Sequence, residues 1–249
     1  MSLDLMVIAP HPDDLEIGCG GTINKLVKQG KKIVAVDLSR GEMSSRGDLK
    51  TRMQESENSK IILGIQDRIN LSLPDSKIIN SYENQIKIVS VIRKYRPKYL
   101  LVPYWQCRHP DHYRSSDLCY EAAFLSGLAK YEDGLEAFRP DKIFYFMLHE
   151  EFTPSFVVDI SEEYKVKIES IMAYKSQFSK PTNKKDFTYI SGDPFLHLIE
   201  TRNRYYGSLV GKMYGEAFLV KEILEYEDPL SIFDYQGKTL NQPMDPSSF

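Results

Sequence analysis

Short apolar runs alternate with segments of helical periodicity through the first half of the chain. The apolar runs predict strands at residues 5–9, 33–38, 68–73 and 99–103. Apolar positions at helical spacing predict helices at residues 15–29, 50–63, 82–95 and 115–128. Strands that alternate with helices in this way are typical of a doubly wound α/β fold, in which helices cover both faces of a mostly parallel sheet.

The alternation is less regular after residue 128. Residues 143–148 and 156–160 are predicted strands, and residues 162–174 and 194–209 are predicted helices. Two polar stretches, residues 39–48 and 104–113, read as loops, and the first is longer than most strand-to-helix connections, which favours contact with a ligand. We predict a single domain over residues 1–236 and an extended or mobile tail over residues 237–249.

Composition indicates an ordinary soluble protein. The chain has 249 residues, of which 42% are hydrophobic and 27% charged, and its net charge is −3. A chain with no basic excess is a poor candidate for nucleic-acid binding. No segment is long and apolar enough to span a membrane, and the amino terminus has no basic segment of a secretory signal, so we expect a cytoplasmic protein. The three cysteines are widely spaced, which argues against a disulfide framework or a Cys-based structural zinc site and favours a packing role.

Two similar tetrapeptides carry the candidate chemistry. The first, His11-Pro12-Asp13-Asp14, follows the first predicted strand, and the second, His109-Pro110-Asp111-His112, follows the fourth. In a doubly wound sheet the fourth strand returns to lie beside the first, so the carboxyl ends of these strands flank the crevice where ligands bind. We therefore expect both tetrapeptides to lie in one crevice.

Imidazole and carboxylate groups in one crevice predict a metal site. Two imidazoles and one carboxylate with an open fourth position form a catalytic zinc arrangement. A three-residue spacing at the start of a helix places two side chains on one face, and a proline at the second position suits the first helical turn. The alternative is structural, with Asp13 or Asp14 as a helix N-cap and Glu16 completing a capping box.

Other patterns carry less information. Gly18, Gly20 and Gly21 could belong to a dinucleotide-binding turn, but their spacing is not that of the dinucleotide fingerprint, and Asp37 alone is a weak ribose signal. Close packing of the helix against the sheet accounts for these glycines better. His149 and His197 lie outside both tetrapeptides, and we interpret them as structural.

The chain resembles the PIG-L/LmbE family of zinc-dependent N-deacetylases, which are Rossmann-like. The resemblance covers roughly residues 4–220 and rests on matching segments: Ala9 with His11-Pro12-Asp13-Asp14, Glu16, Gly18, Gly20-Gly21-Thr22, Leu38-Ser39-Arg40-Gly41-Glu42, Arg52 with Glu55, Leu63-Gly64, Leu73-Pro74-Asp75 and Arg108-His109-Pro110-Asp111-His112. Within the family the chain is most similar to the bacillithiol-biosynthesis deacetylases, which remove acetyl from N-acetylglucosaminyl malate. Four features carry this closer likeness: Pro103-Tyr104, the segment 108–112, Tyr174 with Ser176-Gln177-Phe178, and Tyr214 with Glu216 and Phe218.

The resemblance implies a role for each residue of the two tetrapeptides. His11, Asp14 and His112 would hold Zn²⁺, Asp13 would be the base, and Asp111 would orient His109. The zinc would lower the pKa of a bound water, and Asp13 would take its proton. Charged His109 would stabilise the oxyanion that forms from the acetamide. The resemblance also implies a homo-oligomer.

Three further residues are candidates for substrate binding. Arg52 and Arg108 could bind an anionic group as bidentate forks, or they could form surface ion pairs. Asp75 could accept sugar hydroxyls or serve as a cap or turn residue. Where the family usually supplies an oxyanion-binding tyrosine, an approximate alignment places Phe195, so Tyr189 or His197 could take that role, or zinc and His109 could suffice.

These observations predict an enzyme that deacetylates an N-acetylglucosaminyl conjugate with an acidic aglycone. The substrate class would be a small-molecule N-acetyl amino sugar, with N-acetylglucosaminyl malate favoured. The same chemistry on an antibiotic or a chitooligosaccharide is an alternative. A dinucleotide-binding protein and a metal-binding module without activity are more distant ones.

Overall fold

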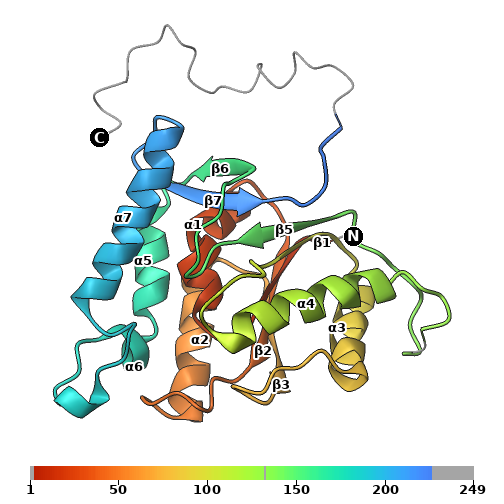
Figure 1. Cartoon of the computed structure of the whole chain (residues 1–249), viewed down its shortest axis with the longest axis horizontal. Coiled ribbons are helices and arrows are strands. Elements are labelled where there is room, and N and C mark those ends of the chain that lie inside the picture. The colour runs from red at the N-terminus through yellow and green to blue at the C-terminus, as the bar shows by residue number, and fades with distance from the viewer. Residues whose placement is uncertain (1–2, 132, 226–249) are drawn as a thin grey trace, which may run out of the picture.

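The computed structural model describes residues 3–131 and 133–225, which contain one seven-stranded sheet and its covering helices (Figure 1). The strands are β1 (Leu3–Ala9), β2 (Ile33–Ser39), β3 (Asp67–Leu73), β4 (Pro97–Pro103), β5 (Lys142–Phe146), β6 (Phe156–Asp159) and β7 (Gly215–Leu219). The helices are α1 (Asp14–Lys28), α2 (Leu49–Leu63), α3 (Tyr82–Tyr95), α4 (Pro110–Leu125), α5 (Tyr164–Met172), α6 (Lys175–Phe178) and α7 (Asp193–Leu209), and Lys184–Asp186 forms a short 3₁₀ turn. The predicted tail, residues 237–249, lies outside the described residues.

The strand order is that of a doubly wound sheet. It runs β3-β2-β1-β4-β5-β7-β6, and β1 pairs in parallel with both β2 and β4. Strand β7 is antiparallel to both of its neighbours, β5 and β6. The predicted Rossmann-like, mostly parallel α/β fold is confirmed, and β1 and β4 meet as the topological switch point requires.

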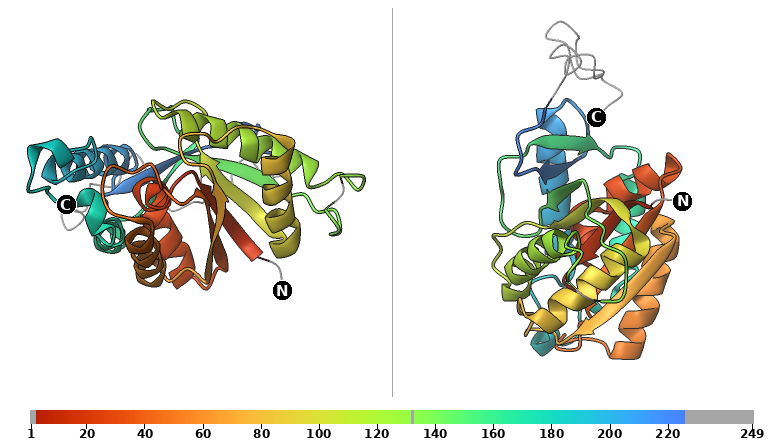
Figure 2. Two further views of the ribbon diagram at one scale, coloured as in Figure 1. Left: turned by 90° about the horizontal axis from the view of Figure 1, so that it is seen from below. Right: turned by 90° about the vertical axis from the view of Figure 1, so that its right-hand side faces the viewer.

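Alternate residues of the central strand point into two separate cores. Leu5, Val7 and Ala9 of β1 pack in one core with residues of α1, α2, α5 and α7. Met6 and Ile8 pack in the other core with residues of α3 and α4. Because side chains alternate along a strand, a continuous apolar run such as β1 requires cover on both faces, and Figure 2 shows helices on both sides of the sheet.

Helix α1 is kinked at Cys19, whose φ of −148° and ψ of 17° are not helical. Buried polar groups satisfy the backbone at the break. The carboxylate of Glu216 accepts hydrogen bonds from the N–H groups of Gly21 (3.0 Å) and Thr22 (2.7 Å), while Nζ of Lys167 donates to the carbonyl of Ile17 (2.8 Å). The first turns of α1, which carry part of the site, are therefore held by a buried ion pair rather than by an unbroken helix.

The glycines of α1 are packing residues. A Cβ at Gly18 would lie 2.3 Å from a carbon of Phe146, and one at Gly21 would lie 2.8 Å from a carbon of Ile160. Only a residue without a side chain lets the helix approach β5 and the residue after β6 this closely. This confirms the packing interpretation for Gly18 and Gly21, which weakens the case for dinucleotide binding.

Three elements differ from the sequence prediction. Strand β7 and the four-residue helix α6 were not predicted, and α4 begins at Pro110, whereas the predicted helix begins at residue 115. Pro110 occupies the first turn of α4, where its missing N–H is not needed. Across the described ranges, no helix combines the length and the apolar character that crossing a membrane requires.

Candidate active site

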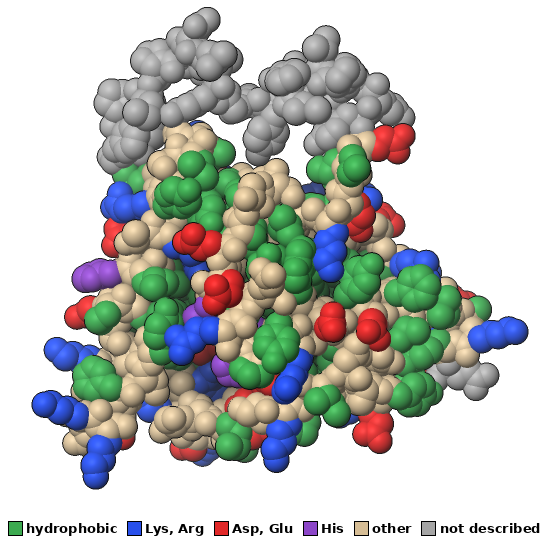
Figure 3. All heavy atoms as spheres, in the orientation of Figure 1, with side chains coloured by type: hydrophobic (Ala, Val, Ile, Leu, Met, Phe, Trp, Pro, Cys, Tyr) green, Lys and Arg blue, Asp and Glu red, His purple; other side chains and the backbone are tan. Residues whose placement is uncertain are grey.

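A cleft of about 280 Å³ opens at the carboxyl ends of β1 and β4. Both tetrapeptides reach it, and Figure 3 shows histidine side chains in a hollow bordered by basic and hydrophobic side chains. The lining residues include His11, Asp13, Asp14, His109 and His112. The two tetrapeptides, about 100 residues apart in the sequence, therefore lie in one cleft as predicted, because β1 and β4 are neighbours in the sheet.

The first tetrapeptide forms a tight turn between β1 and α1. The N–H of Asp14 donates to the carbonyl of His11 (3.3 Å), and the N–H of His11 donates to Oδ2 of Asp14 (3.0 Å). Asp13 adopts a left-handed conformation with φ of 117°, which is costly for a residue with a side chain. Asp13 occupies the N-cap position but makes no side-chain cap hydrogen bond, so the turn aims its carboxylate elsewhere.

Three donor atoms converge on one point of the cleft. Nδ1 of His11 lies 3.0 Å from Oδ2 of Asp14, and Nε2 of His112 lies 3.4 Å from the same oxygen. One ligand atom from each of these residues falls within 4.8 Å of the others, and all three residues are buried. Burial lowers the pKa of His112 to about 3, which leaves its imidazole neutral and able to bind a cation.

The other nitrogen of His11 faces two carboxylates. Nε2 of His11 lies 3.1 Å from Oδ2 of Asp111 and 3.2 Å from Oδ1 of Asp75. Burial alone would lower the pKa of His11. The hydrogen bonds with Asp111, Asp14 and Asp75 raise it by more, so the pKa lies well above its ordinary value. Nδ1 is thus the atom of His11 turned toward Asp14, and Nε2–H is the donor to the surrounding carboxylates.

Asp111 contacts His109 through its backbone, while its carboxylate hydrogen-bonds elsewhere. The Asp111 carboxylate contacts His11 and accepts from the backbone N–H groups of Ser76 (2.7 Å) and Ile78 (3.3 Å). Only the backbone N–H of Asp111 reaches His109, where it donates to Nδ1 at 3.2 Å. One carboxylate oxygen of Asp111 lies within 4.8 Å of a ring nitrogen of His109, and the two N–H groups of the loop after β3 hold the carboxylate in its contact with His11.

This contact sets the tautomer of His109. Because Nδ1 accepts a hydrogen bond, the ring proton sits on Nε2, so the neutral imidazole is still a donor. Burial and the charge of His11 lower the pKa of His109. Nε2–H of His109 is available as a donor in this geometry, and the expected positive charge on the ring stays a prediction.

Asp13 is bound by Arg52. Nη2 of Arg52 donates to Oδ2 of Asp13 (2.8 Å) and to the carbonyl of Pro12 (2.6 Å), and both side chains are buried. Burial raises the pKa of Asp13 to about 7, although the Arg52 guanidinium lowers it. Nε and Nη1 of Arg52 are buried without a hydrogen-bond partner among the described residues. The surface ion-pair interpretation of Arg52 is wrong, since the pair with Asp13 lies at the cleft.

The other two predicted substrate-binding residues also line the cleft. The exposed guanidinium of Arg108 stacks on the ring of Tyr189, with 4.3 Å from its central carbon to the ring centroid. Asp75 is engaged within the protein, because its Oδ1 faces His11 and its Oδ2 accepts from the N–H of Met43 (2.8 Å). Burial raises the pKa of Asp75, but the hydrogen bond from His11 and other donors lower it to about 2.

Sequence reasoning missed two residues beside His112. Cys107 Sγ lies 3.1 Å from Nδ1 of His112 and 3.3 Å from Nδ1 of His149. His149 lines the cleft, and burial together with nearby Arg108 and Arg202 lowers its pKa to about 4. Neither residue belongs to a motif, so the packing role expected for Cys107 and the structural role expected for His149 had no local signal against them.

The residues considered for the role of the family's oxyanion-binding tyrosine lie in different places. Phe195 is buried in the core and stacks with Phe178, and His197 is exposed outside the cleft. Tyr189 lines the cleft beside His149, with 5.6 Å between ring centroids. The long loop after β2 also contributes Gly41 and Ser44 to the lining.

Comparison with known proteins places the chain in a family. The family model described as PIG-L, GlcNAc-PI de-N-acetylase, matches residues 6–123, which span both tetrapeptides. A diacetylchitobiose deacetylase of Thermococcus kodakarensis is 31% identical over 227 residues, which cover 85% of this chain and 80% of that protein.

Solved structures agree with this likeness. The conserved protein TT1542 from Thermus thermophilus is 35% identical with a TM-score of 0.82, over 90% of this chain and 97% of that one. The N,N'-diacetylchitobiose deacetylase from Pyrococcus horikoshii is 26% identical with a TM-score of 0.76, over 87% of this chain and 83% of that one. The chain belongs to the PIG-L family of de-N-acetylases.

Proposed function

We propose that this protein is a zinc-dependent N-deacetylase that hydrolyses the acetamide of an N-acetylglucosaminyl conjugate with an acidic aglycone. The observation that carries the proposal is the convergence of His11, Asp14 and His112 at the cleft beside the carboxylate of Asp13. Family membership supports amide hydrolysis, and the two diacetylchitobiose deacetylases among the relatives support an N-acetyl sugar.

The donor set suits zinc. Two imidazole nitrogens and one carboxylate oxygen make up the three protein ligands of a catalytic zinc site, and the cleft leaves a further position open. The carboxylates of Asp111 and Asp75 behind Nε2 of His11 are the partners that orient a metal-bound imidazole. When bound by His11, Asp14 and His112, zinc would supply Lewis-acid polarisation of the acetamide carbonyl and a lowered pKa for water.

The protein's own groups account for the proton transfers. Asp13 accepts the proton of the attacking water, and Arg52 holds its carboxylate at the edge of the cleft. His109 donates from Nε2–H to the carbonyl oxygen as negative charge develops on it. Asp13 then returns the proton to the nitrogen, the C–N bond breaks, and acetate and a free amine leave.

An acidic aglycone is favoured by the positive charge at the cleft. Arg52 has two buried donor atoms without partners in the described part of the chain, and Arg108 presents its guanidinium at the same opening. Guanidinium groups of this kind bind carboxylates. N-acetylglucosaminyl malate, the substrate of bacillithiol-biosynthesis deacetylases, has that chemistry. A homo-oligomer and a cytoplasmic location remain part of this proposal.

A chitooligosaccharide is the second candidate substrate. The relatives from Thermococcus kodakarensis and Pyrococcus horikoshii act on diacetylchitobiose, a neutral N-acetylglucosamine disaccharide. The two arginines are what favours the acidic conjugate over it.

Acetate release and metal content test the proposal together. We expect about one zinc per chain and fastest acetate release from N-acetylglucosaminyl malate in a panel that also contains diacetylchitobiose and an N-acetylglucosaminide with a neutral aglycone. His112→Ala should lose the zinc, whereas Asp13→Asn should keep it and release acetate about 10²–10⁴ times more slowly. Faster release from diacetylchitobiose would favour the second candidate, and zinc-loaded protein that released no acetate would contradict both.

A further inference from the structure

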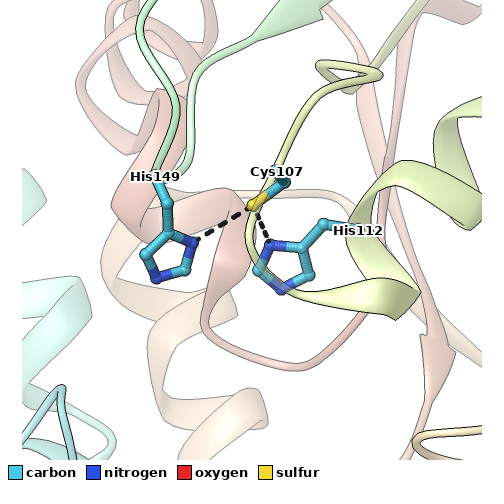
Figure 4. Close-up of side chains that lie close together, drawn as sticks. All are labelled: Cys107, His112 and His149. Carbon is cyan, nitrogen blue, oxygen red and sulfur yellow. Dashed lines mark hydrogen bonds between the residues drawn. The ribbon is translucent and has the colours of Figure 1, made fainter.

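His112 also belongs to a second cluster of side chains that could hold a metal ion, together with Cys107 and His149 (Figure 4). Cys107 comes from the loop between β4 and α4, His112 from the first turn of α4, and His149 from the segment after β5. One donor atom from each falls within 4.8 Å of the others. His149 also lines the cleft, so the cluster is open to a small ion from that side.

The two clusters share one imidazole through opposite ring atoms. Nε2 of His112 faces Oδ2 of Asp14, and Nδ1 faces Sγ of Cys107. The proposed zinc site needs a free lone pair on Nε2 of His112. In that tautomer Nδ1 carries the proton and donates it to the sulfur in a hydrogen bond. The Cys107 S–H then donates to Nδ1 of His149, whose distance of 3.3 Å allows it. Cys107 thus joins the two imidazoles, accepting from one and donating to the other.

We propose that Cys107, His149 and Nδ1 of His112 form a second cation site, selective for a thiophilic ion such as cadmium or excess zinc, and that filling it inhibits the enzyme. The inference rests on the proposed function only in taking His112 as a ligand of the catalytic ion. One thiolate and two imidazoles are a donor set that zinc and softer cations prefer.

The distances need little adjustment for an ion to enter. With Zn–S near 2.3 Å and Zn–N near 2.0–2.1 Å, tetrahedral geometry places sulfur and nitrogen about 3.5 Å apart. The observed separations are 3.1 and 3.3 Å. Binding releases the thiol proton of Cys107 and the Nδ1 proton of His112 to solvent. His112 must then either bridge two cations or turn away from Asp14, and either change disturbs the catalytic set.

The other cysteines provide matched controls. Cys19 is fully buried in α1, where its S–H donates to the carbonyl of Leu15 (3.3 Å), and Cys119 is fully buried in the core under α4. Neither belongs to a cluster of potential metal ligands in the described ranges. The exposed His197 is the corresponding control for His149.

Cadmium titration of the zinc-loaded protein tests the site directly. We expect wild type to bind about two metal ions per chain, measured by mass spectrometry of metals after dialysis, and to develop an ultraviolet thiolate-to-cadmium absorption band. Cys107→Ser should bind about one ion and show no band, and His149→Gln should bind about one ion. Cys19→Ser and His197→Gln should behave as wild type. Half-inhibition of Cys107→Ser should need about tenfold more cadmium, or higher, than wild type.

Three results would overturn the proposal: no band in wild type at saturating cadmium, a band that persists in Cys107→Ser, or two bound ions in His149→Gln. If Cys107→Ser also lost the catalytic zinc, the result with His149→Gln would decide, because the His149 side chain has no hydrogen bond with His11, Asp14 or His112 in the described structure. Failure of the proposed function gives a different result, because that protein would bind no first zinc ion or would release no acetate when loaded.

Discussion

The carboxylate of Asp111 lies 3.1 Å from Nε2 of His11, across an interval of 100 residues in the sequence. This contact joins the two tetrapeptides directly. It also places a carboxylate behind an imidazole whose other nitrogen faces Asp14 at 3.0 Å. Asp111 therefore acts on the candidate metal site through His11, and its effect should appear in metal affinity.

Replacing Asp111 with asparagine should weaken zinc binding about 10–100-fold, because the amide does not balance the proton on His11 as a carboxylate does. Competition with a chelator measures the dissociation constant. Asp117→Asn, on the exposed face of the same helix, should leave the constant unchanged. Melting temperatures with chelator present separate a folding defect from a metal defect. Equal zinc affinity in Asp111→Asn and wild type would show that Asp111 does not support the metal site.

The parallel sheet could be predicted because buried parallel strands are continuous apolar runs, as in β1 and β4. Strand β7 could not. Its five residues include Glu216, which is buried only because Lys167 and the broken turn of α1 surround it. A charged residue in a short segment normally argues against a central strand, and the partners that stabilise it come from distant parts of the chain.

The candidate site divides in a similar way. The convergence of the two tetrapeptides followed from motif position, since they follow β1 and β4, whose carboxyl ends meet at the switch point. The choice of His11, Asp14 and His112 as ligands came from the family resemblance. The partner of Asp111 could not be deduced, because it depends on where the loop after β3 presents its N–H groups. Cys107 and His149 gave no pattern at all, and only the meeting of the segments after β4 and β5 brings them to His112 in the first turn of α4.

Replacing Arg108 with methionine should raise the KM for N-acetylglucosaminyl malate about tenfold and leave the KM for a neutral N-acetylglucosaminide nearly unchanged. The reason is loss of a guanidinium that can pair with the aglycone carboxylates. Steady-state kinetics on both substrates measures the difference. Arg204→Met, outside the cleft, is the matched control. An equal rise for both substrates would mean that Arg108 acts through its packing on Tyr189 instead of through charge.

Replacing Tyr189 with phenylalanine should lower kcat about 10²-fold, with zinc content unchanged, because a hydroxyl donor to the developing oxyanion would be lost. The ring, and with it the stacking on Arg108, is kept in this variant. His197→Gln should have no effect on kcat, since His197 does not line the cleft. A Tyr189→Phe enzyme with kcat within about twofold of wild type would assign oxyanion stabilisation to zinc and His109 alone.

The buried pair of Arg93 and Asp133 should make the stability of the protein fall in acid. Both side chains are almost fully buried, and Arg93 also donates to the carbonyls of Ser126 and Leu128. Burial alone would raise the pKa of Asp133. The N–H of Leu135 and the Arg93 guanidinium lower it by more, so the pKa lies below the ordinary 3.8.

A carboxyl whose pKa is lower in the folded state contributes stability above its unfolded pKa and loses that contribution as pH falls through its folded pKa. Asp133→Asn should therefore cost about 2–3 kcal/mol in the free energy of unfolding at pH 7, and the difference from wild type should shrink below about pH 4. Urea denaturation across pH measures both quantities. Glu136→Gln, in the exposed pair with Arg96, should cost less than about 1 kcal/mol at any pH. A deficit for Asp133→Asn that stayed constant down to pH 2 would mean that packing, and not the charge of Asp133, stabilises this corner of the fold.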